Sequence, residues 1–555
     1  MRRGWVIVLV SMLGSAWAQE QHTTPIQLRG SLSATVEAYT SSGDAPVQRF
    51  LPRYGARLFF RPVVQLFGQV ELPFELALST QTGARTGYPV GFQQPFNQFG
   101  LSPRITSWLR LHGGYFSLSL SELSFGEPRI LGGGVELSPG IFRLKAFYGV
   151  VQQPRALDTL SSFPGTYRRW AWGVSLGFTT EAGAELLLHY VRLLDDTTSI
   201  RLLRVVRDSL RADTIVTPAQ DNAVAALSFR APLGTAVSLQ GELALGAYSS
   251  SLRAPEKDLG VPRWVFVPRY SSNLDGAARV SVIVTPTQAV SIALGGRWIG
   301  PGFVSLGYPW LANDVAEVAV APSLMLAENT VSIRLSGGLQ WNNLRNTRLG
   351  TTRRLISAAA LGWHPSSAFG VDLHYTNYGT RMQHEQDSLR VQNVYQSFSV
   401  APRWQFSGLG GTHVVTGSYN FANTTDQNPI TRAATRQTTH SLLLSHSLLL
   451  SSALTLTTTG TYTQTAAQLE TRLWMLSETV SFPLVPQRLT GSFAGGWSRM
   501  YTLGWDTQWN LRLSLTYHLH RWGVLTWNTF LNRSERAGRR PFLELQSSLN
   551  YGLSF

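Results

Sequence analysis

Residues 509–519 read WNLRLSLTYHL, so that large apolar side chains alternate with polar ones at every step. A period of two is typical of a β-strand that has one apolar and one polar face. The segment is about twice as long as the usual strand of roughly 5–6 residues. Its length matches the roughly 9–11 residues that a tilted strand needs to cross a bilayer. We therefore predict a membrane-spanning strand, with Leu511 and Leu513 facing lipid and Arg512 facing the opposite way.

The same alternation recurs from the beginning of the chain to its end, including residues 26–38 and 543–555. The connections between these segments alternate in length as well. Short turns, predicted for example at residues 112–114 and 232–235, are separated by long polar loops such as residues 193–222. Short turns at one rim and long loops at the other are typical of an antiparallel barrel in an outer membrane.

These patterns predict an all-β fold, a transmembrane antiparallel up-and-down β-barrel of about 26 strands, with 22–26 as the range. A soluble β-sandwich is the alternative, but its strands would be shorter, and one sheet of this length must close to satisfy its edges. Residues 1–18 are predicted to be a signal peptide, 19–25 a short periplasmic segment, and 26–555 a single barrel with long extracellular loops. So short a segment before the first strand leaves no room for an N-terminal plug domain.

The amino terminus carries the features of an export signal. Arg2 and Arg3 precede an apolar run at residues 5–10, and residues 16–18 read AWA, a small-residue cleavage site. The apolar run is too short to cross a bilayer as a helix. The mature chain is therefore expected to begin at Gln19 and to function outside the cytoplasm.

Composition excludes several classes of protein. Only 14% of the 555 residues are charged, against roughly 25% in an ordinary soluble domain. The 17 Trp, 18 Tyr and 26 Phe exclude a disordered chain, and the absence of Cys excludes a disulfide scaffold and thiolate zinc sites. The net charge is +15, but the basic residues are scattered arginines, with Lys145 and Lys257 as exceptions, so nucleic acid is not an expected partner.

The chain ends in the alternating segment Tyr551-Gly552-Leu553-Ser554-Phe555. This segment resembles the C-terminal β-signal of Gram-negative outer-membrane β-barrel proteins. The resemblance implies that Tyr551, Leu553 and Phe555 are recognised by the barrel insertion machinery. It also implies residence in the outer membrane, with lipid and lipopolysaccharide around the barrel. An extended strand with one apolar face suits such recognition, because it can be added to the edge of a growing sheet.

Charged side chains on the polar faces of the predicted strands are expected to line the interior, because an arginine facing lipid at the midplane costs about 2–4 kcal/mol. The expected basic lining consists of Arg29, Arg57, Arg61, Arg143, Lys145, Arg230, Arg279, Arg297, Arg334, Arg403 and Arg512. The expected acidic lining is smaller and consists of Glu37, Glu71, Glu75, Glu185, Glu242, Glu317, Asp372 and Glu544. The interior should therefore carry a modest excess of positive charge.

A stripe of arginines stands out in the long loop at residues 193–222. At helical spacing the four side chains share one face, opposite an apolar one. They are Arg201, Arg204, Arg207 and Arg211. An amphipathic loop helix that folds into the lumen would constrict it with positive charge, whereas a solvated hairpin above the membrane is the alternative.

No motif for catalysis, cofactor binding or metal binding survives inspection, so we do not expect an enzyme. Residues 173–177 match G-x-S-x-G, but a nucleophile elbow requires a sharp turn into a helix. Ser175 lies among alternating apolar residues and is predicted to be a pore-facing serine in the middle of a strand.

Two functions therefore remain open. The first is a channel or transporter for polar or anionic solutes, with a lumen constricted by loops. The alternative is the barrel component of a secretion or envelope-assembly complex, plugged by a partner protein. Both functions provide something that blocks a wide lumen, either loops or a partner protein. Such a block is expected because natural barrels of about 22 or more strands have lumens that are plugged.

Overall fold

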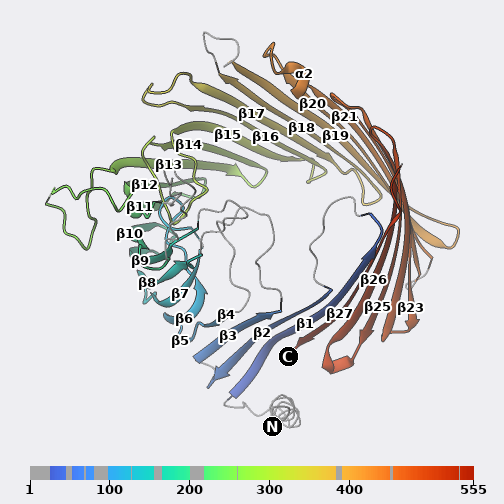
Figure 1. Ribbon diagram of the computed structural model, residues 1–555, viewed down its shortest axis with the longest axis horizontal. Helices are drawn as coiled ribbons and strands as arrows, with labels where there is room; N and C mark the ends of the chain where they lie inside the picture. Colours follow the sequence, from blue (N-terminus) through green and yellow to red (C-terminus); the bar gives the residue numbers. More distant parts are fainter. Residues whose placement is uncertain are drawn as a thin grey trace, which may run out of the picture.

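The computed structural model describes residues 26–44, 53–67, 70–80, 98–126, 128–155, 165–200, 218–258, 260–382, 390–450, 454–536 and 538–555. The predicted signal peptide and the predicted segment 19–25 lie outside the described residues. The strands form a single closed ring, in which the first and last strands lie side by side (Figure 1). The predicted all-β, up-and-down, antiparallel barrel is confirmed.

The first third of the wall contains nine strands in sequence order. Strands that are consecutive along the chain pair antiparallel, except that β4 and β5 pair with β3 and β6 and not with each other. They are β1 (Ile26–Ser42), β2 (Tyr54–Leu66), β3 (Val70–Ser79), β4 (Gln98–Leu101), β5 (Arg104–Thr106), β6 (Leu109–Ser117), β7 (Arg129–Leu137), β8 (Phe142–Gln152) and β9 (Arg168–Thr179).

The β4 and β5 segments occupy one position in the ring, because both pair with β3 and with β6. Ser102 and Pro103 separate β4 from β5, and backbone hydrogen bonds still connect these two residues to the neighbouring strands. The Ser102 N–H donates to the Pro73 carbonyl at 3.1 Å, and the Leu111 N–H donates to the Pro103 carbonyl at 2.9 Å. The 27 strands therefore fill 26 positions, the number that the sequence predicts.

The middle of the wall continues the same meander. Its strands are β10 (Glu185–Asp196), β11 (Asp221–Leu233), β12 (Val237–Ser249), β13 (Ser272–Thr287), β14 (Val290–Ile299), β15 (Val315–Leu326), β16 (Val331–Asn342), β17 (Thr352–Trp363), β18 (Phe369–Met382) and β19 (Val391–Gly408).

The last part of the wall returns to β1. Its strands are β20 (Gly411–Asp426), β21 (Gln437–Leu449), β22 (Thr455–Ala466), β23 (Thr471–Val485), β24 (Leu489–Tyr501), β25 (Trp505–His518), β26 (Val524–Arg536) and β27 (Phe542–Ser554). Short helices α2 (Arg432–Thr435) and η2 (His520–Trp522) lie in two connections. Among the described residues, no helix has the length and apolarity required to span a membrane.

The ring closes where β1 pairs with β27. The register runs from Ser31 opposite Ser554 to Ser42 opposite Leu543. The final residue extends the pairing, because the Phe555 N–H donates to the Gly30 carbonyl at 3.0 Å and the Gly30 N–H donates back to the Phe555 carbonyl at 2.6 Å. The chain is therefore hydrogen-bonded into the wall as far as its last residue.

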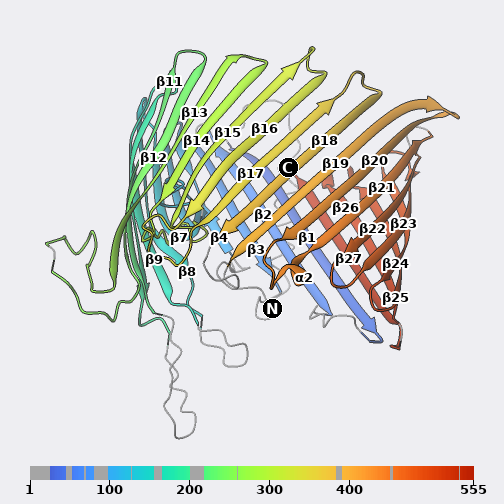
Figure 2. The same ribbon diagram turned by 90° about the horizontal axis from the view of Figure 1, so that it is seen from above.

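The two rims differ in their connections. Along one rim, tight turns join β11 to β12, β13 to β14, and so on up to β19 and β20. The helix α2 lies on the opposite rim (Figure 2). The turn predicted at residues 112–114 is wrong, because this segment lies inside β6. Gly114 permits close packing in the sheet, since a Cβ on it would lie 2.5 Å from the Phe99 carbonyl oxygen. Near the end of the chain the long-loop rim also has short connections, such as residues 502–504 between β24 and β25.

Residues that are partners in the register share one face of the sheet, so the pairing divides the wall into an inner and an outer face. The outer face is apolar and carries exposed leucines such as Leu444, Leu476 and Leu511. Aromatic side chains stand at its two margins, for example Trp298 at the loop end of β14 and Trp404 toward the turn end of β19. An apolar band between two aromatic girdles is typical of a transmembrane β-barrel.

Candidate functional site on the inner wall

Arginines of β1 and β2 pair with glutamates across the inner face. Arg29 contacts Glu71 at 2.6 Å, Arg57 contacts Glu37 at 3.0 Å, and Arg61 contacts Glu75 at 3.2 Å. The three arginine side chains are about half exposed, so solvent reaches them from the interior. The structure therefore places these three predicted lining residues together in one row of ion pairs.

Several of the carboxylates on this side of the barrel contact more than one cation. Glu71 also contacts Arg104 at 3.7 Å, and Glu75 also contacts Arg129 at 2.9 Å. A third carboxylate, Glu136 of β7, is contacted by His112 at 2.9 Å, by Arg110 at 3.7 Å and by Lys145 at 3.8 Å. We call this wall of β1–β8 the charge ladder. Its arginines and lysine outnumber the glutamates that they contact, so it carries a net positive charge.

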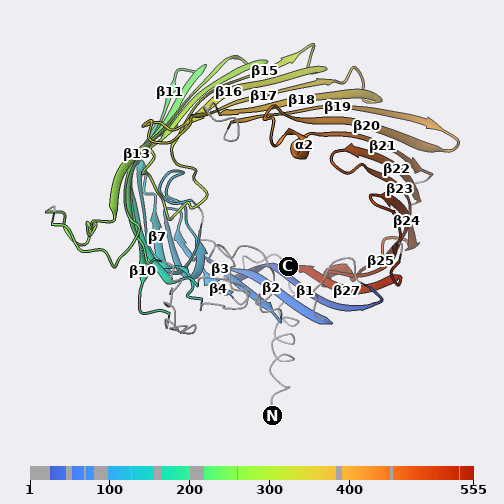
Figure 3. The ribbon, with the colours of Figure 1, turned by 45° about the horizontal axis from the view of Figure 1, so that its top comes forward.

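Two loops fold inward and cover the inner face of β7–β14 (Figure 3). We call them the inner pad, which consists of residues 118–126 and 300–314. Its buried apolar residues are Leu118, Leu120, Leu123, Phe125 and Phe303. They pack against small and branched inward residues of the wall, among them Ala171, Val191, Val224 and Ala244. A fully buried Leu or Phe contributes roughly 1.5–3 kcal/mol relative to exposure, so the pad is a packed layer.

Polar contacts fix the first loop of the pad to the wall. The Leu123 N–H donates to the Glu242 carboxylate of β12 at 3.0 Å, and Glu242 is buried. Glu122 forms an ion pair with Arg279 of β13. Lys145 of β8 donates to the Ser119 carbonyl at 3.3 Å. Lys145 and Arg279 were predicted to line the lumen, and the structure places both on the inner face as supports of this loop.

The second loop of the pad is held by buried side chains of the wall. The Asn222 amide donates to the Val304 carbonyl and accepts from the Leu306 N–H, each at 2.8 Å. Asp275 accepts from the Gly302 N–H at 2.7 Å. The Ser305 hydroxyl donates to the Ser124 carbonyl at 2.6 Å, which joins the two loops. The pad is therefore one hydrogen-bonded unit.

Sequence reasoning missed the pad and placed the constriction elsewhere. Arg201, Arg204, Arg207 and Arg211 lie outside the described residues. A signal for the pad was present, because Leu118, Leu120 and Phe125 are large apolar residues that directly follow the sequence of β6. Residues 118–126 begin by continuing the period-two alternation of β6, a pattern that is typical of a strand and does not indicate a loop that folds inward.

The other predicted basic residues lie on the inner face by register. Arg297 pairs with Glu317 at 2.6 Å, whereas Arg143 donates to the backbone carbonyls of Gly140 and Phe142 at 2.6 and 2.8 Å. The remaining ones form no ion pair with another described residue. They are Arg230, Arg334, Arg403 and Arg512.

The inner face of β20–β22 has a different chemistry, because it is covered by hydroxyl groups. Across β21 and β22 the hydroxyls pair as Ser441 with Thr463 at 2.6 Å and Ser447 with Thr457 at 3.0 Å. The alternate, inward positions of β22 are all threonine. They are Thr455, Thr457, Thr459, Thr461, Thr463 and Thr465. We call this region the hydroxyl wall, and its inward positions on β22 carry no formal charge.

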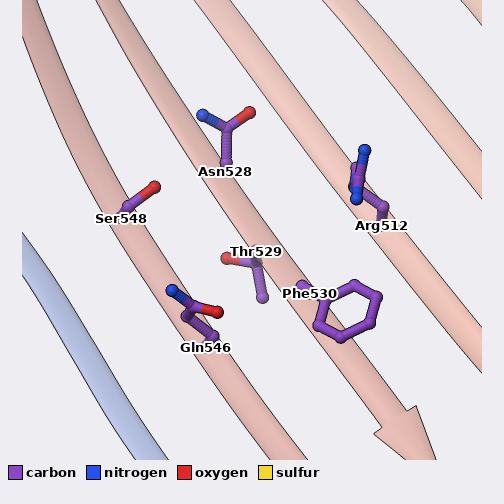
Figure 4. A pocket seen from close by; sticks show the side chains of 6 residues that line it. All are labelled: Arg512, Asn528, Thr529, Phe530, Gln546 and Ser548. Carbon is purple, nitrogen blue, oxygen red and sulfur yellow. The ribbon is translucent and has the colours of Figure 1, made fainter. Parts of the chain in front are cut away.

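A concave site of about 480 Å³ lies on the inner face beyond the hydroxyl wall, on β25–β27. Arg512 projects from β25, Asn528 and Phe530 from β26, and Gln546 and Ser548 from β27 (Figure 4). The Arg512 guanidinium carbon lies 5.8 Å from the centre of the Phe530 ring. A cation beside amides and an aromatic ring is suited to binding a polar organic anion.

Ser175, the serine of the G-x-S-x-G match, lies in the middle of strand β9 and is buried on the inner face. The structure therefore lacks the strand–turn–helix geometry that a nucleophile elbow requires at this serine. Among the described residues, no group of three or more His, Asp or Glu side chains is placed to hold a metal ion.

No protein-family model and no curated protein matches the chain. The chain is similar to the vanillate-bound OpdK of Pseudomonas aeruginosa, with 11% identity, a TM-score of 0.31, and coverage of 61% of this chain and 93% of that chain. OccAB4 of Acinetobacter baumannii shows 11% identity and a TM-score of 0.30, with 67% and 97% covered. The PapC translocation pore of the P pilus usher shows 11% identity and a TM-score of 0.29, with 96% and 100% covered. These values do not place the chain in a family.

The pad's attachment through Glu242 gives a testable prediction in this cysteine-free chain. In a Ser124→Cys variant the new thiol is expected to be shielded, because Ser124 has no exposed surface. Adding Glu242→Ala removes the acceptor of the Leu123 N–H, and labelling of the thiol by a water-soluble reagent should accelerate about tenfold or more. Adding Glu185→Ala, which removes an inward glutamate from the turn end of β10, should leave the rate unchanged. Fast labelling with Glu242 intact would contradict the packed pad.

Proposed function

We propose that the protein is an outer-membrane channel for polar solutes with a preference for anions, and that inward-folded loops narrow its lumen. The observation that carries the proposal is the charge ladder, whose arginines and lysine outnumber their carboxylate partners. Fixed positive charge beside a low-dielectric wall raises the local concentration of anions. The inner pad supplies one narrowing element, and the loop of Arg201, Arg204, Arg207 and Arg211 is the second element of the proposal.

The proposed location is the outer membrane of a Gram-negative bacterium. The apolar outer face with its two aromatic margins supports a lipid environment, including lipopolysaccharide. Export by the signal peptide at residues 1–18, with maturation at Gln19, is part of this proposal. So is delivery to the barrel insertion machinery through Tyr551, Leu553 and Phe555, whose side chains share the outer face of β27 and its end.

The alternative is a barrel component of a secretion or envelope-assembly complex. The size of the ring favours it, because 26 strand positions exceed the roughly 16–18 strands of barrels that leave an aqueous channel. The inner pad covers only the β7–β14 side of the wall. In this alternative a partner protein fills the remaining space.

Conductance and ion selectivity of the purified barrel in a planar bilayer test the proposed function. We expect an open channel that passes chloride better than potassium, with a preference that falls at 1 M salt, where the screening length is about 3 Å. The double variant Arg29→Gln/Arg61→Gln should lower the preference. The matched double variant Arg353→Gln/Arg381→Gln removes two charges from the outer face and should leave the preference for chloride unchanged.

Cation preference, or equal effects of the two double variants, would refute anion selection by the ladder. A barrel that inserts but never conducts would favour the partner-plugged alternative.

The role of the last residue generates a second test. Phe555→Ala removes an aromatic side chain that lies 6.3 Å, ring centre to ring centre, from Phe60 on the outer face. We expect normal export but a several-fold decrease in heat-modifiable, folded barrel in outer-membrane fractions. Ser554→Ala changes the neighbouring inward position and should have little effect. Wild-type amounts of folded Phe555→Ala barrel would contradict a signal role.

A further inference from the structure

Arg512 differs from the arginines of the charge ladder in its surroundings. It forms no ion pair with a described residue, whereas Arg29, Arg57 and Arg61 each contact a glutamate. Its register partners on the neighbouring strands are Ala494 and Phe530, neither of which offers a hydrogen-bond acceptor on its side chain. The guanidinium is exposed to the interior, so its five N–H donors are available to a solute.

The polar groups around Arg512 are also available. No hydrogen bond joins the side-chain amide of Asn528 or of Gln546 to another described residue, and each amide offers both donors and an acceptor. Among the described residues, Ser548 accepts one long side-chain hydrogen bond, of 3.4 Å, from Asn550. Phe530 adds an apolar ring face beside the cation. The site thus combines one cation, two amides, a hydroxyl and one aromatic ring.

We propose that this site binds a hydroxylated carboxylate of the sugar-acid class. The Arg512 fork matches the two oxygens of one carboxylate, and charge-assisted pairs of this kind are the strong ones. The Asn528 and Gln546 amides match vicinal hydroxyls, since each can donate and accept at the same time. The apolar face of a sugar ring can lie against Phe530. The proposal rests on the proposed function, because the solute must enter the lumen to reach the site.

The composition of the site argues against simpler occupants. A small inorganic anion would use the guanidinium and leave both amides and the ring without a role. A neutral sugar would leave the uncompensated charge of Arg512 unused. The neighbouring strands favour a hydroxylated solute as well, because the hydroxyl wall of β20–β22 lines the same interior and offers hydrogen-bonding groups without formal charge on β22.

Equilibrium binding to the detergent-solubilised full chain tests the proposal by calorimetry, with D-glucuronate, D-glucose and acetate as probes. We expect glucuronate to bind about tenfold or more tightly than either of the other two. Arg512→Gln should weaken glucuronate binding about tenfold or more, because a charged hydrogen-bond pair is lost. Phe530→Leu should weaken glucuronate and leave acetate unchanged. Arg334→Gln removes another inward arginine that forms no ion pair with a described residue and lies outside this site, and it should change neither glucuronate nor acetate binding.

Each remaining outcome decides against the site or against the channel. Equal affinity for glucuronate and acetate, or equal effects of Arg512→Gln and Arg334→Gln, would overturn the site, because either result means general attraction of anions. Glucuronate binding that Arg512→Gln abolishes, in a barrel that does not conduct, would support the site and refute the channel. An anion-selective channel that binds no glucuronate would leave the channel standing and refute the site.

Discussion

The hydrogen-bonded pairing of β1 with β27 is the contact on which the rest of the structure depends. Hydrocarbon offers no partner to a backbone N–H or carbonyl, so an open sheet edge within a bilayer is not viable. Twelve register pairs between these two strands, extended by the bonds of Gly30 with Phe555, remove both edges. Because closure joins residues more than 500 positions apart, the whole chain must be present before the wall is complete.

Closure of the barrel also determines which side chains face the interior. In a closed wall each strand presents alternate residues to lipid and to the lumen, so the polar half of every strand meets the polar half of its neighbours. This brings Arg29 and Glu71, which are 42 positions apart, within 2.6 Å. The described part of the interior includes the charge ladder, the inner pad, the hydroxyl wall and the Arg512 site. The pad is the one apolar layer among them, because its leucines and phenylalanines pack on apolar inward residues of the wall such as Val191, Val224 and Phe147.

The sequence predicts the strands of the wall well but does not predict the inner pad that covers part of it. A period of two identifies strands and their faces, and the register puts every predicted basic lining residue on the inner face. The same period does not reveal the loop at residues 118–126, where apolar alternation continues from β6 into a segment that packs on the wall instead of joining it. The reading of residues 112–114 as a turn failed because glycine serves close packing as well as turns. Partners such as Glu242 for the Leu123 N–H depend on tertiary packing, which no local pattern encodes.

A disulfide between β1 and β27 tests the closure of the barrel most directly. Thr35 of β1 donates to the Asn550 side chain of β27 at 2.8 Å, and the two residues are register partners. In the double variant Thr35→Cys/Asn550→Cys, mild oxidation of the folded barrel should join the ends of the chain and change its mobility on a heated denaturing gel. The offset pair Thr35→Cys/Gln546→Cys should not cross-link, because Gln546 is the partner of Tyr39. Absence of the aligned cross-link, or equal yields for the two pairs, would contradict the closed barrel.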